Sequence, residues 1–200
     1  RNPPLRHIDH MNLVVSELNS EYSVIFHDDD ILHPDYMSVM ASFLNNNNIV
    51  AVGCNGMNFK NDILDSKNVL DSKLRIHNLS SPIKFNNEKE FLERYLPGNG
   101  GNASLPSYMY RTKYLKQAMI KAPFRGKHFD VGIVSSLLNY GTIVWLKKPL
   151  VYYRWHTSNL SITESIPERI ALLNYMKKKG VEKNSTNFLL LRIMFEVKWI

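Results

Sequence analysis

The fold of this chain is decided by the stretch Tyr22-Ser23-Val24-Ile25-Phe26-His27-Asp28-Asp29-Asp30. Its first five residues are mostly β-branched or aromatic, which favours a short buried strand over residues 22–26. That strand runs directly into three carboxylates, whose like charges repel each other unless a cation lies among them. Side chains alternate in an extended chain, so Asp28 and Asp30 are expected to face one side. The pattern predicts a divalent metal ion, Mn²⁺ or Mg²⁺, held by Asp28 and Asp30.

A purely structural interpretation of the acidic triplet stays open. The three carboxylates also suit a turn ahead of a helix, which Asp35 can open after Pro34. The apolar strand before the triplet and the proline after it favour the metal site, because together they place the carboxylates at the end of a sheet strand.

Residues 24–37, from Val24 to Met37, resemble the Asp-X-Asp region of the GT-A-fold inverting glycosyltransferases of family two, of the bacterial surface-polysaccharide type. The similarity covers roughly residues 5 to 161, judged by the order of motifs. It implies an α/β, GT-A-like (Rossmann-like) fold with a central, mostly parallel sheet flanked by helices. It also implies that Asp28 and Asp29 contact the diphosphate of a nucleotide-sugar while Asp28 and Asp30 bind its metal ion.

Length and composition are those of one globular domain. The chain has 200 residues and a formal net charge of +7, which favours anionic partners. No Arg-rich recognition helix or zinc-finger spacing is present, so no specific nucleic-acid binding is expected. The only cysteine, Cys54, follows an apolar run and is expected in the core of a protein from a reducing compartment. Apolar runs of about 18 residues are absent, so we expect a cytoplasmic protein, with peripheral contact at the inner membrane face as a further possibility.

Hydrophobic spacing predicts helices that alternate with strands. The first helix covers residues 5–19, and the second begins near Asp35 with Met37, Met40 and Leu44 on its apolar face. Residues 55–84 are polar and are expected to be irregular. We expect a GT-A catalytic domain over residues 1–161 and a C-terminal helical extension over 162–200. The other predicted helices are 86–96, 112–121, 130–139, 164–179 and 186–200, and the other predicted strands are 49–54, 107–111, 142–146 and 150–155.

One part of the GT-A pattern is missing from this sequence. Two βα units that form the nucleotide pocket normally precede the Asp-X-Asp strand, and here only about 20 residues do. We therefore expect a fragment of a longer enzyme, in which strand 22–26 exposes an edge that further strands would cover.

Asp130 is the predicted catalytic base. It ends the segment Phe124-Arg125-Gly126-Lys127-His128-Phe129-Asp130, which resembles the family region that supplies an acidic residue at the start of a helix. A positioned carboxylate can accept the proton of the acceptor hydroxyl. Asp is also a preferred N-cap, so a structural role stays open. The family often has a Glu-Asp pair at this place, and Phe129 replaces the first acid here.

A third group of residues resembles the Tyr-Arg-X-His segment after the last sheet strand of the family. Here it reads Tyr153-Arg154-Trp155-His156. Arg154 is expected to clamp the diphosphate, and His156 to bind the metal ion or a phosphate, unless it is a simple surface histidine.

Aromatic residues make up the predicted acceptor site. Tyr108 and Tyr110 lie in a stretch that resembles the acceptor-side strand of the family, and Trp155 is expected to lie near them in the fold. Their rings are suited to stack on sugar faces, although aromatic residues at strand spacing are equally typical of a core.

The leading hypothesis is a metal-dependent inverting glycosyltransferase. It would move a sugar from a nucleotide-diphospho-sugar to a glycan or lipid-linked acceptor in surface polysaccharide synthesis. Two alternatives stay open: a metal-dependent nucleotidyl or phosphoryl transferase, which needs no Asp130, and a non-catalytic carbohydrate-binding fragment.

Overall fold

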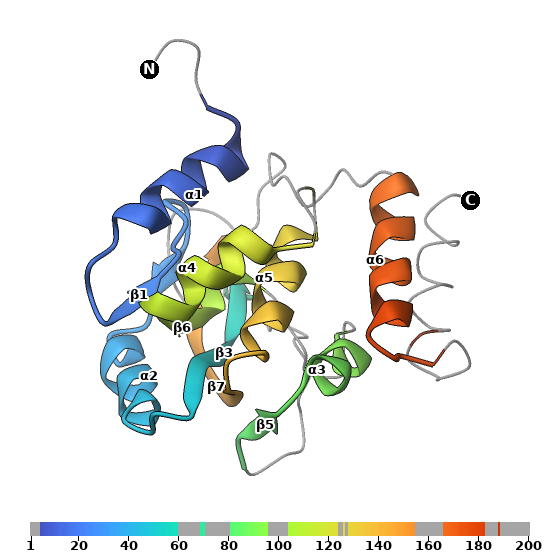
Figure 1. The fold of residues 1–200 in the computed structure, drawn as a ribbon. Helices are drawn as coiled ribbons and strands as arrows, with labels where there is room; N and C mark the ends of the chain where they lie inside the picture. The colour runs from blue at the N-terminus through green and yellow to red at the C-terminus, as the bar shows by residue number, and fades with distance from the viewer. Residues whose placement is uncertain are drawn as a thin grey trace.

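The computed structural model describes residues 5–59, 69–70, 81–95, 104–123, 126, 128–154, 166–182 and 188. They form one mixed sheet with helices on both of its faces (Figure 1). The helices are α1 (His7–Glu17), α2 (Tyr36–Leu44), α3 (Glu88–Arg94), α4 (Thr112–Lys121), α5 (Phe129–Leu137), α6 (Ile166–Lys178) and the short 3₁₀ turn η1 (Leu105–Ser107). The strands are β1 (Tyr22–Val24), β2 (Ile31–Leu32), β3 (Ile49–Phe59), β4 (Val69–Leu70), β5 (Ile83–Phe85), β6 (Tyr108–Arg111) and β7 (Thr142–Arg154).

The sheet confirms the predicted α/β class but not the predicted strand directions. The described strands are ordered β1-β6-β3-β7-β2, with β4 beside β3 and β5 beside β7. Only β3 and β7 run parallel, and the other described pairings are antiparallel. The prediction of a mostly parallel sheet was therefore wrong. β1, β2 and β6 are short, so their sequences carry too little pattern to reveal their direction.

Alternating side chains divide the core between the two faces of the sheet. On β3, Ala51 packs with one cluster, while Val52 and Cys54 pack with the other. The first cluster takes residues from α1, α3, α4, α5 and α6, and the second takes residues from α2. This division follows from the two-residue period of a strand. Covering both faces makes the central strands apolar throughout, which is why the run 49–54 was recognisable in the sequence.

Gly53 is the position where the sheet is packed most closely. It pairs with Tyr108 on one side and with Trp145 on the other, and the two rings lie 5.4 Å apart between centroids. A Cβ at Gly53 would lie 2.5 Å from the Trp145 ring and 2.6 Å from the Tyr108 ring. Only glycine lets the two aromatic rings meet over the strand.

Several element predictions are confirmed, and some are corrected. The buried residues of α2 are Tyr36, Met40 and Leu44, whereas Met37 is 58% exposed and was wrongly assigned to the apolar face. The polar segment 55–84 begins with the end of β3, which continues to Phe59. The two strands expected over 142–146 and 150–155 are one strand, β7, whose described part ends at Arg154. The helix predicted over 186–200 lies outside the described residues apart from Phe188.

β1 is an edge strand among the described residues. Its only described neighbour is β6, through the pairs Tyr22 with Arg111 and Val24 with Met109. The fragment prediction required one open edge at this strand, and the described structure has it. Among the described helices, none is both long and apolar enough to cross a bilayer.

Candidate active site

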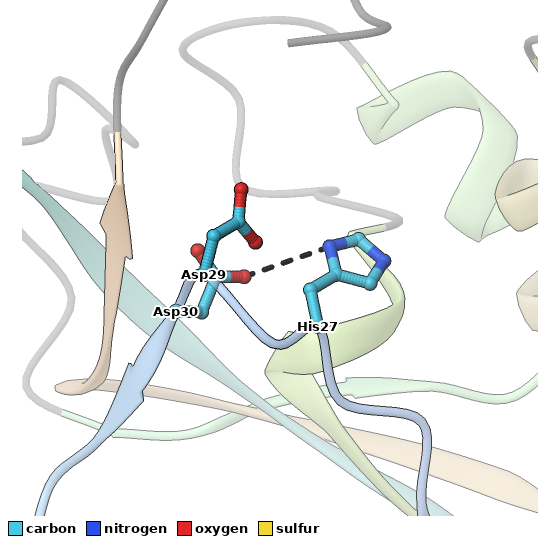
Figure 2. A group of neighbouring side chains, drawn as sticks. All are labelled: His27, Asp29 and Asp30. Atoms are coloured by element: carbon cyan, nitrogen blue, oxygen red, sulfur yellow. Dashed lines mark ion pairs between the residues drawn. The ribbon is translucent and has the colours of Figure 1, made fainter. Parts of the chain in front are cut away.

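A tight turn follows β1 and gathers three side chains. Residues 28 and 29 form the turn, and the Asp30 N–H donates to the His27 carbonyl over 3.4 Å. The first and last residues of such a turn lie side by side. The His27 imidazole therefore comes next to the Asp30 carboxylate, with Nδ1 3.6 Å from Oδ2. Figure 2 shows this pair together with the neighbouring Asp29.

β7 holds the turn from the other side. Asp30 leads into β2, which pairs with Tyr152 and Val151 of β7. The Arg154 backbone N–H donates to Asp30 Oδ1 over 3.0 Å, and Arg154 Nε donates to the Asp29 carbonyl over 2.8 Å. The Arg154 guanidinium also lies over the Phe59 ring, 4.8 Å from its centroid. The carboxylates are thus fixed at the carboxyl ends of the parallel strands β3 and β7, where α/β sheets bind ligands.

The group His27, Asp29 and Asp30 fits a metal ion. One ligand atom from each residue lies within 4.8 Å of the others. The Asp30 side chain is only 1% exposed, while the His27 side chain is 40% exposed, so the group has a buried floor and an accessible rim. Two carboxylates and one imidazole form a donor set that divalent ions accept, with positions left for other ligands.

The structure changes which aspartates form the group. The alternation argument placed Asp28 with Asp30, and it is wrong because residues 27–30 form a turn and not an extended strand. Asp28 is exposed and lies outside the group, whereas Asp29 joins Asp30 in it. No metal role was predicted for His27, although a turn over residues 27–30 would bring it next to Asp30.

Asp130 lies in the first turn of α5, one residue inside the helix. His128 is the N-cap, so the interpretation of Asp130 as a cap is not supported. Asp130 Oδ1 accepts a hydrogen bond from the Val131 N–H at 2.8 Å. The end of α5 leads through residues 138–141 into the start of β7, so Asp130 is at the helix end far from that connection.

Tyr108 and Tyr110 are core residues in this structure, contrary to the prediction that they contact an acceptor sugar. Both rings are fully buried and stacked on each other, with centroids 5.8 Å apart. The Tyr110 hydroxyl donates to the Leu105 carbonyl over 3.2 Å. Burial, together with the nearby negative charge of Asp130, raises the pKa of both phenols well above its usual value. A ring enclosed in this way offers no face to a sugar.

Two predicted site residues, Trp155 and His156, lie outside the described residues. Of the others, the structure brings Asp29, Asp30 and Arg154 together and adds His27 to them. Cys54 takes no part in the site. It is buried as expected, and burial raises the pKa of its thiol to about 12.

The described fold is similar to solved structures of TarS from S. aureus, residues 1–349. One of these structures is a complex with UDP-GlcNAc, with 16% sequence identity and a TM-score of 0.54 over 88% of this chain and 46% of that chain. The other has 14% identity and a TM-score of 0.56 over 92% of this chain and 50% of that chain. Glucosyl-3-phosphoglycerate synthase from Mycobacterium tuberculosis, in complex with phosphoglyceric acid, has 14% identity and a TM-score of 0.44 over 92% and 59% of the two chains.

No protein-family model matches the chain, and no curated protein matches it in sequence. The chain spans about half the length of the TarS chains that it resembles. TarS is a GT-A-type glycosyltransferase, and at this level of identity the similarity establishes the fold. The fold resemblance predicted from residues 24–37 is therefore confirmed: this chain has a GT-A-like fold.

Proposed function

We propose that this chain is part of a metal-dependent inverting glycosyltransferase that uses a nucleotide-diphospho-sugar. The observation that carries the proposal is the turn of His27, Asp29 and Asp30, held by β7 at the carboxyl ends of β3 and β7 in a GT-A-like fold. The TarS structure of the same fold contains UDP-GlcNAc, a nucleotide-sugar. An acidic group at this end of the sheet suits the metal ion that accompanies a diphosphate.

The residues in and around the turn would have different roles in binding the metal ion and the diphosphate. Asp29 and Asp30 would hold the ion, and the Arg154 backbone would keep the Asp30 carboxylate in place through its hydrogen bond. The Arg154 guanidinium contacts the Asp29 carbonyl and the Phe59 ring, so it supports the turn. The same two contacts set the orientation of its terminal nitrogens. A bound ion supplies positive charge that stabilises the leaving diphosphate. Asp28 is exposed and lies outside the group, so any contact that it makes with the donor would be on the side open to solvent.

Asp130 would act as the base of a single displacement. Its carboxylate would accept the proton of the acceptor hydroxyl while that oxygen bonds to the anomeric carbon. The bond to the diphosphate breaks on the opposite face of the sugar, so the configuration inverts. A base in this role contributes about 10²–10⁴-fold to the rate. We further propose a glycan or lipid-linked acceptor, with Trp155 as a stacking residue and His156 as a further ligand.

The test compares Asp30→Asn with native protein in calorimetric titrations of UDP-sugars, with and without Mn²⁺. Asparagine keeps the oxygen that accepts from the Arg154 N–H, so the fold should persist while one anionic ligand is lost. We expect the Mn²⁺-dependent part of the binding to fall at least about tenfold, because ligand charge sets the affinity of an oxygen site.

Asp35→Asn is the matched control, because Asp35 is a nearby aspartate that pairs with Lys148 and lies outside the group. Equal nucleotide affinity for native and Asp30→Asn protein in Mn²⁺ would refute the metal role. Metal-dependent binding without any sugar transfer on addition of acceptors would favour the nucleotidyl transferase or the carbohydrate-binding alternative.

A further inference from the structure

An imidazole nitrogen lies among the carboxylates of the turn. His27 Nδ1 is 3.6 Å from Asp30 Oδ2, which is too long for a hydrogen bond. Two ligand atoms at about 2.1 Å from one ion are separated by about 3 to 4.2 Å, depending on the angle between them. The 3.6 Å separation of His27 and Asp30 falls in this range. The three ligand atoms of the group lie within 4.8 Å of one another, so side-chain movements of under about 1 Å would bring all of them around one ion.

The surroundings of His27 allow it to act as a ligand. Its side chain is 40% exposed, so its ring can adjust to an ion without disturbing the core. Asp30 is fixed in contrast, because the Arg154 N–H holds Oδ1 while Oδ2 faces His27. Figure 2 shows a ring nitrogen of His27 facing the Asp30 carboxylate, with Asp29 beside it. The exposed imidazole of His27 therefore faces the Asp30 carboxylate, which a backbone hydrogen bond holds in place.

We propose that His27 is a nitrogen ligand of this ion and that it makes the site select first-row transition-metal ions, Mn²⁺ among them, over Mg²⁺. The inference rests on the proposed metal-dependent function. Mg²⁺ prefers an all-oxygen octahedral shell, whereas first-row transition-metal ions, even Mn²⁺ at the weak end of the series, accept imidazole more readily than Mg²⁺ does. The carboxylates of Asp29 and Asp30 alone would accept either ion, so His27 adds a preference that they lack.

The proposal is tested by comparing the Mn²⁺ and Mg²⁺ affinities of the native 200-residue chain and its variants at one fixed pH. Mn²⁺ binding is measured by electron paramagnetic resonance, and Mg²⁺ by its competition with Mn²⁺. His27→Gln replaces the nitrogen with an amide that can still form hydrogen bonds. We expect its Mn²⁺ affinity to fall about 10- to 100-fold, with Mg²⁺ affinity changed less than about threefold.

His33→Gln is the matched control. His33 forms a similar pair, with Nδ1 3.7 Å from Asp35 Oδ2, but this pair is not part of the three-residue group. We expect its ratio of Mn²⁺ to Mg²⁺ affinity to equal that of native protein. Equal losses of both ions in His27→Gln would show that His27 only supports the turn, and unchanged affinities would show that it does not contact the ion. Either result overturns the proposal.

A spectroscopic measurement separates His27 from His156, the other predicted histidine ligand. Electron spin-echo spectra of bound Mn²⁺ report coordinated ¹⁴N. The His156→Gln protein should keep a nitrogen signal, and His27→Gln/His156→Gln should lose it. A signal that disappears in His156→Gln, or persists in the double variant, refutes the role of His27 while leaving the proposed function intact. Native protein that binds no Mn²⁺ would overturn both this inference and the metal dependence of the proposed function.

Discussion

Asp130 has one observed structural contact and one proposed catalytic role. It lies in the first turn of α5 and accepts from the Val131 N–H at 2.8 Å. The N–H groups at a helix start stabilise negative charge, so this position suits a carboxylate. Its charge is close enough to Tyr108 and Tyr110 to contribute, after burial, to the raised pKa of both phenols.

Replacing Asp130 with Asn separates the two roles. Asn keeps the oxygen that accepts from Val131, so the free energy of unfolding should fall by less than about 1 kcal/mol, the value of one charge at a helix start. Sugar transfer should fall about 10²–10⁴-fold, because the base is lost. Denaturant unfolding and initial transfer rates check the two expectations. Asp35→Asn serves as the control, since Asp35 also stands at a helix start, as the N-cap of α2. Normal transfer by a folded Asp130→Asn protein would exclude the base.

At the scale of residues, the sequence predicted that acidic side chains gather after β1, but not which of them lie together. Asp30 and Arg154 are where the motif order placed them, and they are joined by a hydrogen bond. One backbone turn explains why Asp29 and not Asp28 lies beside Asp30, and why His27 lies there too. Three consecutive aspartates suit a turn as well as a strand end, so side-chain alternation could not decide between them.

Among the elements, α6 is attached to the rest of the fold by a buried polar group. Glu88 of α3 accepts from Lys179 Nζ at 2.6 Å, from the Tyr175 hydroxyl at 2.5 Å and from Asn139 Nδ2 at 2.7 Å. Burial and this carboxylate raise the pKa of Tyr175 well above its usual value, so the phenol stays a donor. The group therefore joins α3 to Asn139, just after α5, and to Tyr175 and Lys179 at the end of α6.

Removing the Glu88 carboxylate should loosen α6. Glu88→Ala leaves the three donors without their shared acceptor, and we expect a loss of about 2–4 kcal/mol in the free energy of unfolding. Glu93→Ala on the same helix is the control, because Glu93 pairs with Lys89 at 3.7 Å near the surface. A pair of this kind contributes about 0–1 kcal/mol. Urea unfolding of both variants measures the difference, and similar losses for the two would refute the anchoring role of Glu88.

Element boundaries were predictable where local signals agreed. α4 covers Thr112–Lys121, as its amphipathic spacing and the following Pro123 predicted. β7 was divided in the prediction because Pro149 interrupts its apolar pattern. In the structure the strand continues, with its pairing to β3 shifted between Leu146 and Pro149. The shift leaves Lys148 and Pro149 exposed, so the proline lies where a bulge tolerates it. A bulge depends on the partner strand, which the local sequence does not specify.

The whole molecule has a sheet that is covered on both faces, and β1 is open on one side among the described strands. α2 covers one face and the remaining described helices cover the other. The apolar character of the central strands was therefore predictable from their sequence. The burial of Tyr108 and Tyr110 was not, because β6 is buried on both of its faces and alternation then carries no information. Nor did the sequence show strand direction, since hydrophobic patterns are the same for parallel and antiparallel neighbours of a covered strand.

The open edge leads to a prediction about association. β1 has β6 on one side only among the described strands, and Phe26, just beyond it, is 41% exposed. An unprotected strand edge with apolar side chains pairs readily with another chain. We therefore expect the 200-residue chain to self-associate at micromolar concentrations in sedimentation velocity. Phe26→Lys should shift it towards monomer, because charge at an edge opposes strand pairing. Met37→Lys is the control, since Met37 is an exposed apolar residue on a helix, α2, and offers no strand edge for pairing. Equal effects of the two substitutions would make association a matter of general surface hydrophobicity, and a native chain that stays monomeric would show that this edge is protected.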